Sequence, residues 1–179
     1  MLALAARRLY LGERVPGLDM TVPTAPVRFV ADVMLGRLAR WLRILGYDTL
    51  YSPTLDDPEL ARIARLEDRI LLTADVELAR RRGLRVILVS DDRIEAQLRA
   101  VSRELRLSVH EAFSRCINCN TTLVELDREE ARPLVPPYVF ATQTRFRRCP
   151  RCGKVFWRGT HWARMRAALE SGDFGGENG

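Results

Sequence analysis

Residues 28–49 read RFVADVMLGRLARWLRILGYDT, and the order of apolar and polar residues in them predicts the fold of the first half of the chain. A short apolar run over 27–32 predicts a buried strand that ends in an acid, Asp32. Leucines and alanines then recur at helical spacing over 35–45, and Gly46 follows where a glycine commonly ends a helix. The DTLY that comes next predicts a second short strand. A strand, a helix and a strand in this order predict a right-handed unit of two parallel strands joined by a helix.

The alternation of strands and helices continues beyond the second strand. RILLTAD at 69–75 and LRVILVS at 84–90 predict two more strands, and the first of them again ends in an acid, Asp75. Apolar residues at helical spacing predict helices that separate and follow these strands, over 58–68, 76–82 and 93–105, with Gly83 just past the end of the second. Four apolar strands alternating with helices predict an α/β domain over 28–115 with a doubly wound parallel sheet.

Three aspartates are the candidates for an acidic site. Asp32 and Asp75 lie at carboxyl ends of predicted strands, and Asp57 is predicted to cap the helix over 58–68, with Pro58 at its first position. If the strand order is 2-1-3-4, the order reverses between strands one and three, which brings Asp32 and Asp75 to one crevice with Asp57 above it. Carboxylates that converge repel one another unless a cation holds them, and oxygen ligands suit Mg²⁺ or Mn²⁺.

Such a metal can support phosphodiester hydrolysis, because it activates water and stabilises a leaving oxygen. Each aspartate also has an ordinary interpretation. Asp57 alone is typical of a helix cap, and Asp32 and Asp75 alone are typical of solvated carboxylates at strand ends.

The four cysteines of the chain form two CxxC pairs: Cys116 with Cys119, and Cys149 with Cys152. Each pair can form a tight turn that points two thiolates at one tetrahedral ion, and Gly153 favours the second turn. TTLVEL at 121–126 and KVFW at 154–157 predict supporting strands. A dithiol redox site or disulfides are the alternatives, but a redox CxxC is expected near the start of a βαβ helix. Four thiolates leave zinc no open position, which predicts a structural Zn²⁺ in a zinc ribbon over 116–170.

The positive charge of the chain is concentrated near its second CxxC pair. The 179 residues include 29 Lys and Arg against 23 Asp and Glu, a formal net charge of +6. Eight of the basic residues, and no acid, lie within 145–166, where aromatic residues are interleaved with them. This pattern indicates phosphate contacts combined with base stacking. The candidates for nucleic-acid contact here are Arg147, Arg148, Lys154, Arg158 and His161. The alternatives are an arginine-rich codon usage, a solvated basic face and aromatic residues that cap a small ribbon.

Three further arginines recur every three residues on the predicted helix over 35–45: Arg37, Arg40 and Arg43. They lie opposite the leucines, so we expect an exposed face that could steer an anionic substrate toward the aspartates. The same spacing is also what any solvated helix face gives.

Some classes of protein are excluded. No apolar run approaches the roughly 18–20 residues of a membrane span, so we expect no transmembrane helix and no membrane partner. The opening MLALAA is too short for a signal sequence, and its arginines follow it, so we expect a cytoplasmic protein. Residues 1–27 have no clear periodicity and are expected to form a poorly defined leader, and 171–179 a flexible tail.

The strings RFVADVMLGRLARWLRILGYDT, DDPELARIA, RILLTAD, CINCNTTL and CPRCGKVFWRGTHWARM occur in this order between residues 28 and 165. Together they resemble the Mut7-C family of PIN-like RNase domains with a C-terminal zinc ribbon. The resemblance implies a metal-dependent nuclease whose acids lie at the carboxyl edge of a parallel sheet. It assigns Asp32 to the acid after the first strand, Asp57 to the acid that opens the next helix, and Asp75 to the acid of a TxD motif.

The sequence departs from the usual PIN pattern at one point. Typical PIN domains carry a further acid on a helix before the equivalent of Asp57, but only SPTLD separates Tyr51 from Asp57. This departure implies a trimmed fold with one metal ion rather than two. Asp91 and Asp92 follow the fourth strand and could supplement the site, although no motif supports them.

The leading hypothesis is a ribonuclease in which Asp32, Asp57 and Asp75 hold Mg²⁺ or Mn²⁺ and orient the attacking water. The rival is an RNA-binding module that is catalytically weak or inactive, which the missing fourth acid favours. A protein–protein adaptor is a third option, and it would show no salt-dependent affinity for nucleic acid. PIN-like nucleases are often homodimers, although no self-complementary face is visible in the sequence.

Overall fold

The protein is described by a computed structural model that covers residues 26–105, 107 and 112–159. Most of the predicted leader, the predicted tail, the end of the predicted ribbon and the candidate His161 lie outside the described residues.

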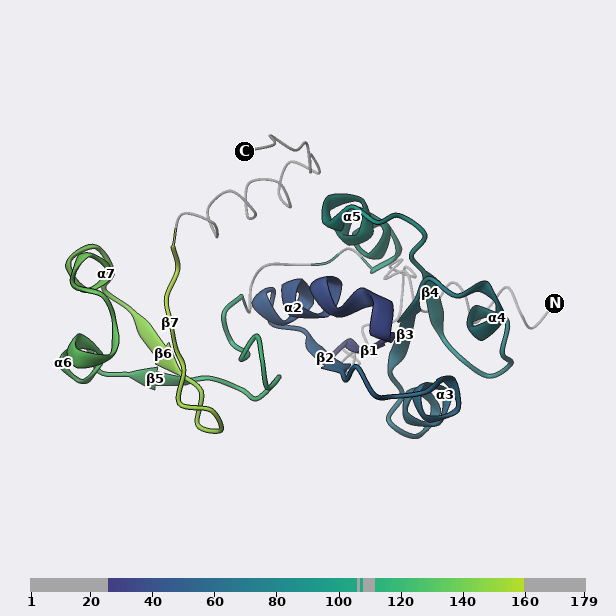
Figure 1. Cartoon of the computed structure of the whole chain (residues 1–179), viewed down its shortest axis with the longest axis horizontal. Coiled ribbons are helices and arrows are strands. Elements are labelled where there is room, and N and C mark those ends of the chain that lie inside the picture. Colours follow the sequence, from purple (N-terminus) through teal and green to yellow (C-terminus); the bar gives the residue numbers. More distant parts are fainter. Residues whose placement is uncertain (1–25, 106, 108–111, 160–179) are drawn as a thin grey trace, which may run out of the picture.

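The first part of the described chain is built on a four-stranded sheet whose strands are all parallel. The strands are β1 (Arg28–Ala31), β2 (Asp48–Tyr51), β3 (Ile70–Thr73) and β4 (Val86–Leu88). Their order is β2-β1-β3-β4 (Figure 1), so the order reverses between β1 and β3. This arrangement confirms the predicted α/β fold and places the carboxyl ends of β1 and β3 side by side.

Helices cover both faces of this sheet. They are η1 (Val33–Leu35), α2 (Gly36–Ile44), α3 (Asp57–Leu66), α4 (Val76–Ala79) and α5 (Ile94–Leu105). Helices α2 and α5 lie on one face and α3 on the other (Figure 1). None of the helices in the described part of the chain is long and apolar enough to cross a membrane.

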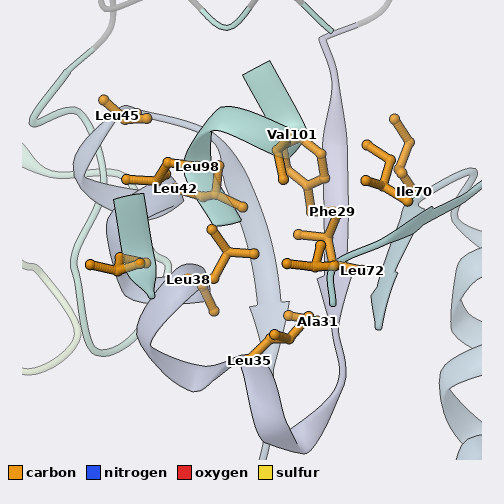
Figure 2. Packing of buried hydrophobic residues seen from close by; sticks show 14 of the residues in the cluster. Phe29, Ala31, Leu35, Leu38, Leu42, Leu45, Ile70, Leu72, Leu98 and Val101 are labelled. Atoms are coloured by element: carbon orange, nitrogen blue, oxygen red, sulfur yellow. The ribbon is translucent and has the colours of Figure 1, made fainter. Parts of the chain in front are cut away.

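The alternation of side chains along β1 explains the three layers. Phe29 and Ala31 pack with Leu38 and Leu42 of α2 on one face (Figure 2), and Val30 packs under α3 on the other. All five side chains are fully buried. A strand buried on both faces must be apolar where it is covered, which is why FVA, after the partly exposed Arg28, is a continuous apolar run.

The start of α3 differs from the prediction, because Asp56 rather than Asp57 is its N-cap. The Asp56 carboxylate accepts the Glu59 backbone N–H at 2.8 Å, and the Glu59 carboxylate accepts the Asp56 N–H at 3.1 Å. This reciprocal pair needs an acid three residues after the cap, and Glu59 stands in that position only for Asp56. Asp57 is therefore the first helical residue, and its carboxylate is not used by the cap.

A second, antiparallel sheet forms the ribbon, with strands β5 (Val124–Leu126), β6 (Phe146–Arg148) and β7 (Val155–Phe156) in that order. Three short elements, which the sequence reading did not predict, connect β5 to β6: α6 (Arg128–Ala131), η2 (Arg132–Leu134) and α7 (Pro137–Thr142). They bury Ala131, Val135 and Val139 against Phe146. The ribbon therefore has a small apolar core of its own.

Candidate functional sites: an acidic sheet edge and a cysteine cluster

Asp32 follows β1 and is held by two hydrogen bonds at the carboxyl edge of the sheet. The Val33 backbone N–H donates to its Oδ1 at 2.6 Å, and the Thr73 hydroxyl donates to its Oδ2 at 2.7 Å. Only 6% of the residue is exposed. Because each carboxylate oxygen has a donor on a rigid element, the orientation of this side chain is fixed before any ligand binds.

Thr73 connects Asp32 to Asp75. Its hydroxyl donates to the Asp32 carboxylate and accepts the Asp75 backbone N–H at 3.0 Å. The Asp75 carboxylate lies at the surface and caps α4, where it accepts the N–H groups of Glu77 and Leu78 at 2.6 and 3.1 Å. The structure thus brings Asp32 and Asp75 into one network at the point where the strand order reverses. Thr73 is the first residue of the TxD motif, and the motif alone did not predict a role for it.

Asp57 stands apart from this network. Its Oδ2 pairs with Arg81 Nη2 at 3.3 Å, and both side chains are well exposed. In the described residues, one group of potential metal ligands has all its donor atoms within 4.8 Å of one another, and it consists of the four cysteines. The three aspartates form no such group as they stand, although all three begin or precede elements at the same edge.

The supplementary candidates after β4 make local contacts. Asp91 accepts the Arg93 backbone N–H at 2.8 Å, and its carboxylate also bonds the Arg93 guanidinium. These hydrogen bonds from Arg93 lower the pKa of Asp91. Asp92 is exposed.

The cysteine cluster is already assembled: all four Sγ atoms lie within 4.8 Å of one another, and none is in a disulfide. Its two halves repeat the same turn. The Cys119 N–H donates to Cys116 Sγ at 3.4 Å, and the Cys152 N–H donates to Cys149 Sγ at 3.5 Å. The residue after each pair, Asn120 or Gly153, has a positive φ of 62° or 72°. Two turns of this kind that face each other are typical of a tetrahedral zinc site.

The electrostatics of the cluster favour a bound cation. Burial raises the pKa of the Cys116 thiol to about 12. The exposed Cys152 has its pKa lowered to about 7, first by a hydrogen bond from the Lys154 backbone N–H. Four thiolates so close together repel one another without a positive ion between them. The donor set therefore fits Zn²⁺, with no position left for a substrate.

Arg43 joins the first cysteine turn to the parallel sheet. Its Nε donates to the Thr49 carbonyl of β2 at 2.9 Å, and its Nη1 donates to the carbonyls of Ile117 and Asn118 at 2.9 and 3.0 Å. The residue is only 5% exposed. The prediction that Arg43 lies on an exposed face was wrong, because the cysteine turn covers it. Burial lowers the pKa of this guanidinium, and the nearby Cys116 and Cys119 act in the opposite direction.

Asn120 makes a second connection at the same place. Its Oδ1 accepts the Thr49 backbone N–H at 3.1 Å, and its Nδ2 donates to Asp48 Oδ1 at 2.7 Å. Asp48 also pairs with Arg69 at 2.7 Å. Burial works to raise the pKa of Asp48, but the hydrogen bonds from Arg69 and Asn120 outweigh it and leave that pKa below its ordinary value. The cysteine turn is thus fixed to β2 by a hydrogen-bonded network.

The predicted nucleic-acid residues lie on two surfaces. Arg37 and Arg40 are exposed on α2, and Arg148, Lys154 and Arg158 are exposed on the ribbon. Two ribbon arginines reach back to the segment that leads into the ribbon: Arg147 donates to the Phe113 carbonyl at 2.8 Å, and Arg158 donates to the Ala112 carbonyl at 3.4 Å.

The structure thus defines an α/β protein with a four-stranded parallel sheet, joined to a ribbon with four clustered cysteines. The chain belongs to the Mut7-C RNAse domain family, whose profile matches residues 27–169, as its motifs predicted. It is also similar to a human protein named "Exonuclease mut-7 homolog", with 36% identity over 107 residues. The matched part is 55% of this chain and 12% of that relative. No solved structure matches the chain. The family and this relative support a nuclease function.

Proposed function

We propose that the chain is a metal-dependent ribonuclease that hydrolyses RNA phosphodiester bonds at the acidic edge of its parallel sheet. The observation that carries this proposal is the hydrogen-bonded connection Asp32–Thr73–Asp75 at the point where the strand order reverses. Ligands of doubly wound sheets bind at this position. Membership of an RNAse domain family supports RNA as the substrate.

The three aspartates would hold the Mg²⁺ or Mn²⁺. Asp32 supplies a fixed carboxylate, because Val33 and Thr73 hold its two oxygens. Asp75 and Asp57 supply carboxylates from the surface, and Asp57 gives up only a solvent-exposed ion pair, which is worth about 0–1 kcal/mol. A divalent ion bound there would lower the pKa of a coordinated water and stabilise the leaving oxygen.

The ribbon contributes binding rather than chemistry. A zinc ion on the four cysteines would be structural, since the protein fills its coordination sphere. Arg147, Arg148, Lys154 and Arg158 would contact RNA phosphates from the ribbon, and the further candidate His161 lies outside the described residues. Arg37 and Arg40 would attract the RNA toward Asp32 from α2. A cytoplasmic location and a homodimer stay predictions.

The proposal is tested by incubating the purified chain with pooled RNA in the presence of Mn²⁺ or Mg²⁺. The variants Asp32→Asn and Asp75→Asn keep the shape of the side chain but remove a metal-binding charge. Each should lower the cleavage rate by about 100-fold or more, the size of effect typical of a lost catalytic group. Mn²⁺ should also raise the Tm of the wild type and leave the Tm of Asp75→Asn unchanged, because a ligand that binds the folded state stabilises it.

Asp68→Asn is the matched control. Asp68 precedes β3 and lies at the opposite edge of the sheet, where it pairs with Arg85, and its φ of 48° suits an asparagine. This variant should cleave at the wild-type rate. Cleavage that is equal in Asp32→Asn, Asp75→Asn and Asp68→Asn would refute the proposed acidic site.

A second candidate function, an RNA-binding module without useful catalysis, is favoured by one observation. The three carboxylates do not form a cluster as close as the four sulfur atoms. This alternative predicts RNA affinity that falls with salt and survives all three Asp→Asn substitutions, together with no cleavage in Mn²⁺. Variants at Arg147 or Arg148 would weaken such binding.

A further inference from the structure

A groove of about 580 Å³ lies where the ribbon meets the segment that leads into it. Residues of β5, β6 and β7 line it, together with Phe113 of the connecting segment. Four arginines and two carboxylates give the lining a net charge of +2, and four aromatic residues make up much of the rest. Its volume falls within the range of roughly 300–1,000 Å³ that is usual for ligand sites. Among the described residues, its lining includes none of the three aspartates of the acidic edge.

The arginines of this groove are placed for an anion. Arg147 is anchored by its bond from Nη1 to the Phe113 carbonyl at 2.8 Å. A guanidinium has five N–H donors, so one such bond fixes the group and leaves others for a phosphate. Arg145 is exposed and forms no ion pair with any residue that the structure describes. Together with Arg158, these residues concentrate positive charge along one side of the ribbon.

Phe113 reaches the groove through an unusual backbone conformation. Its φ is 61°, which is rare for a bulky side chain and costs of the order of 1–3 kcal/mol. The conformation is held at both ends of the residue. The Phe113 N–H donates to the Ile44 carbonyl at 2.8 Å, and its carbonyl accepts from Arg147. Strain of this kind persists where the surrounding structure enforces it, and it is common at binding sites.

We propose that this groove binds one unpaired nucleotide of a single-stranded RNA. Its phosphate would contact Arg145 and Arg147, and its base would stack on Phe113 or Trp157. Glu125, which also lines the groove, could accept a hydrogen bond from an exocyclic amine of the base. Unpaired bases in RNA are recognised in this way, by stacking on aromatic rings and by hydrogen bonds to their edges.

The mixture of groups argues against other occupants. An acidic peptide would gain from the arginines, but the two carboxylates of the lining would repel it and its acidic side chains would not stack on the aromatic rings. In a duplex the bases are stacked on one another, and their faces cannot reach the rings of a groove. An unpaired nucleotide uses the charge, the rings and the acceptors together.

The proposal rests on the proposed function, since it makes the groove an anchor for the RNA that the acidic edge would cut. Helix α2 connects the two places. It begins four residues after Asp32, and the carbonyl of its last residue, Ile44, accepts the Phe113 N–H. Nine helical residues rise by roughly 14 Å, so one short RNA strand can reach both.

The test measures binding of a labelled single-stranded RNA of about twelve nucleotides, a length within the usual site sizes. The full zinc-loaded chain carries Asp32→Asn, and divalent metal is omitted, so that binding is seen without cleavage. Phe113→Gly removes the ring, and glycine accepts the positive φ. It should weaken binding by about tenfold, the effect of one lost stacked base. Arg145→Gln should weaken it a few-fold and reduce the salt slope by about 1.

Arg62→Gln is the matched control, because it removes one positive charge, as Arg145→Gln does, from an exposed position on α3. It should bind RNA as the parent chain does. Wild-type affinity in both groove variants would overturn the proposal, as would equally tight binding of duplex RNA or equal competition by an acidic peptide. Arg145 is at the surface, so its variant decides the outcome if Phe113→Gly does not fold. If the wild type cleaves RNA while the groove variants bind normally, only the groove proposal fails. If the groove variants lose binding while the wild type cleaves nothing, only the proposed function fails.

Discussion

The acidic edge and the cysteine cluster are both candidate metal sites, but they are prepared for metal to different degrees. The four sulfur atoms already lie within 4.8 Å of one another, on two turns that repeat each other in hydrogen bonding and in backbone conformation. At the acidic edge only Asp32 and Asp75 are connected, and Asp57 is paired with Arg81. The four cysteines are brought together, whereas the three aspartates proposed to hold a metal are not.

The two places also differ in how much the surrounding fold depends on a metal ion. The cysteine cluster lies in a ribbon with a small core, so zinc would supply a large share of the ribbon's stability. The acidic edge lies on a sheet with two layers of buried side chains and does not need a metal to fold.

The greatest loss of structure is expected when the ribbon loses a zinc ligand. Cys149→Ser removes a buried ligand, and the ribbon should then unfold and lose its zinc. Binding energies of about 10–16 kcal/mol for structural zinc exceed what a small core supplies alone. Zinc per chain and the circular dichroism spectrum provide the measurement. Arg151→Lys, between the cysteines of the second pair, should keep about one zinc ion. A folded ribbon without metal would contradict the prediction.

An intermediate effect is expected where the two regions meet. Arg43→Leu leaves the carbonyls of Thr49, Ile117 and Asn118 without their donor. Since a buried polar group that loses its partner costs about 1–3 kcal/mol, the free energy of unfolding should fall by roughly 2–4 kcal/mol. Denaturant unfolding measures the change. Arg40→Ala, on the exposed face of the same helix, should stay within about 0.5 kcal/mol of the wild type. Equal stability of both variants would show that the turn is not fixed by Arg43.

The smallest expected effect is a pH dependence at Asp48. Its pKa is lowered in the folded state from an ordinary value of 3.8, so the charged form contributes stability above that pH and loses it as the pH falls through the folded pKa. Asp48→Asn should therefore be less stable than the wild type by about 1–2 kcal/mol at neutral pH. The gap should narrow below pH 3.8. Unfolding curves for both proteins between neutral and acidic pH measure it, and a gap that is constant with pH would count against the role of the charge.

The sequence predicted those features that depend on short-range patterns. The four strands follow from apolar runs such as FVA and ILL, and the cysteine turns follow from the CxxC spacing. The helix predicted over 76–82 was too long, since α4 ends at Ala79. The three arginines that follow Ala79 are residues that favour a helix. The backbone nevertheless ends the α-helix in a tight turn, in which the Arg81 N–H donates to the Leu78 carbonyl.

The features that sequence reasoning missed depend on contacts between distant residues. Arg43 reads as a solvated residue of a helix face, and its burial follows from a turn 74 residues further along the chain. Asp56 and Asp57 both precede Pro58, and only the side chain of Glu59 distinguishes the cap from its neighbour. The short elements α6 and α7 span too few residues for a periodic signal, although Asp127 and Pro137 mark their starts.

The contact between the cysteine turn and β2 has a consequence for solubility. Strand β2 lies at the edge of the parallel sheet, and an open strand edge is a template on which another chain can add a strand. At Thr49 the backbone N–H donates to Asn120 of the cysteine turn and the carbonyl accepts from Arg43 of α2, so the turn and the helix together block the middle of this edge. A truncation that ends the chain before Cys116 would remove Asn120 and leave the Thr49 N–H at this edge without its partner. The shortened domain would then be prone to aggregate even where its own core is intact.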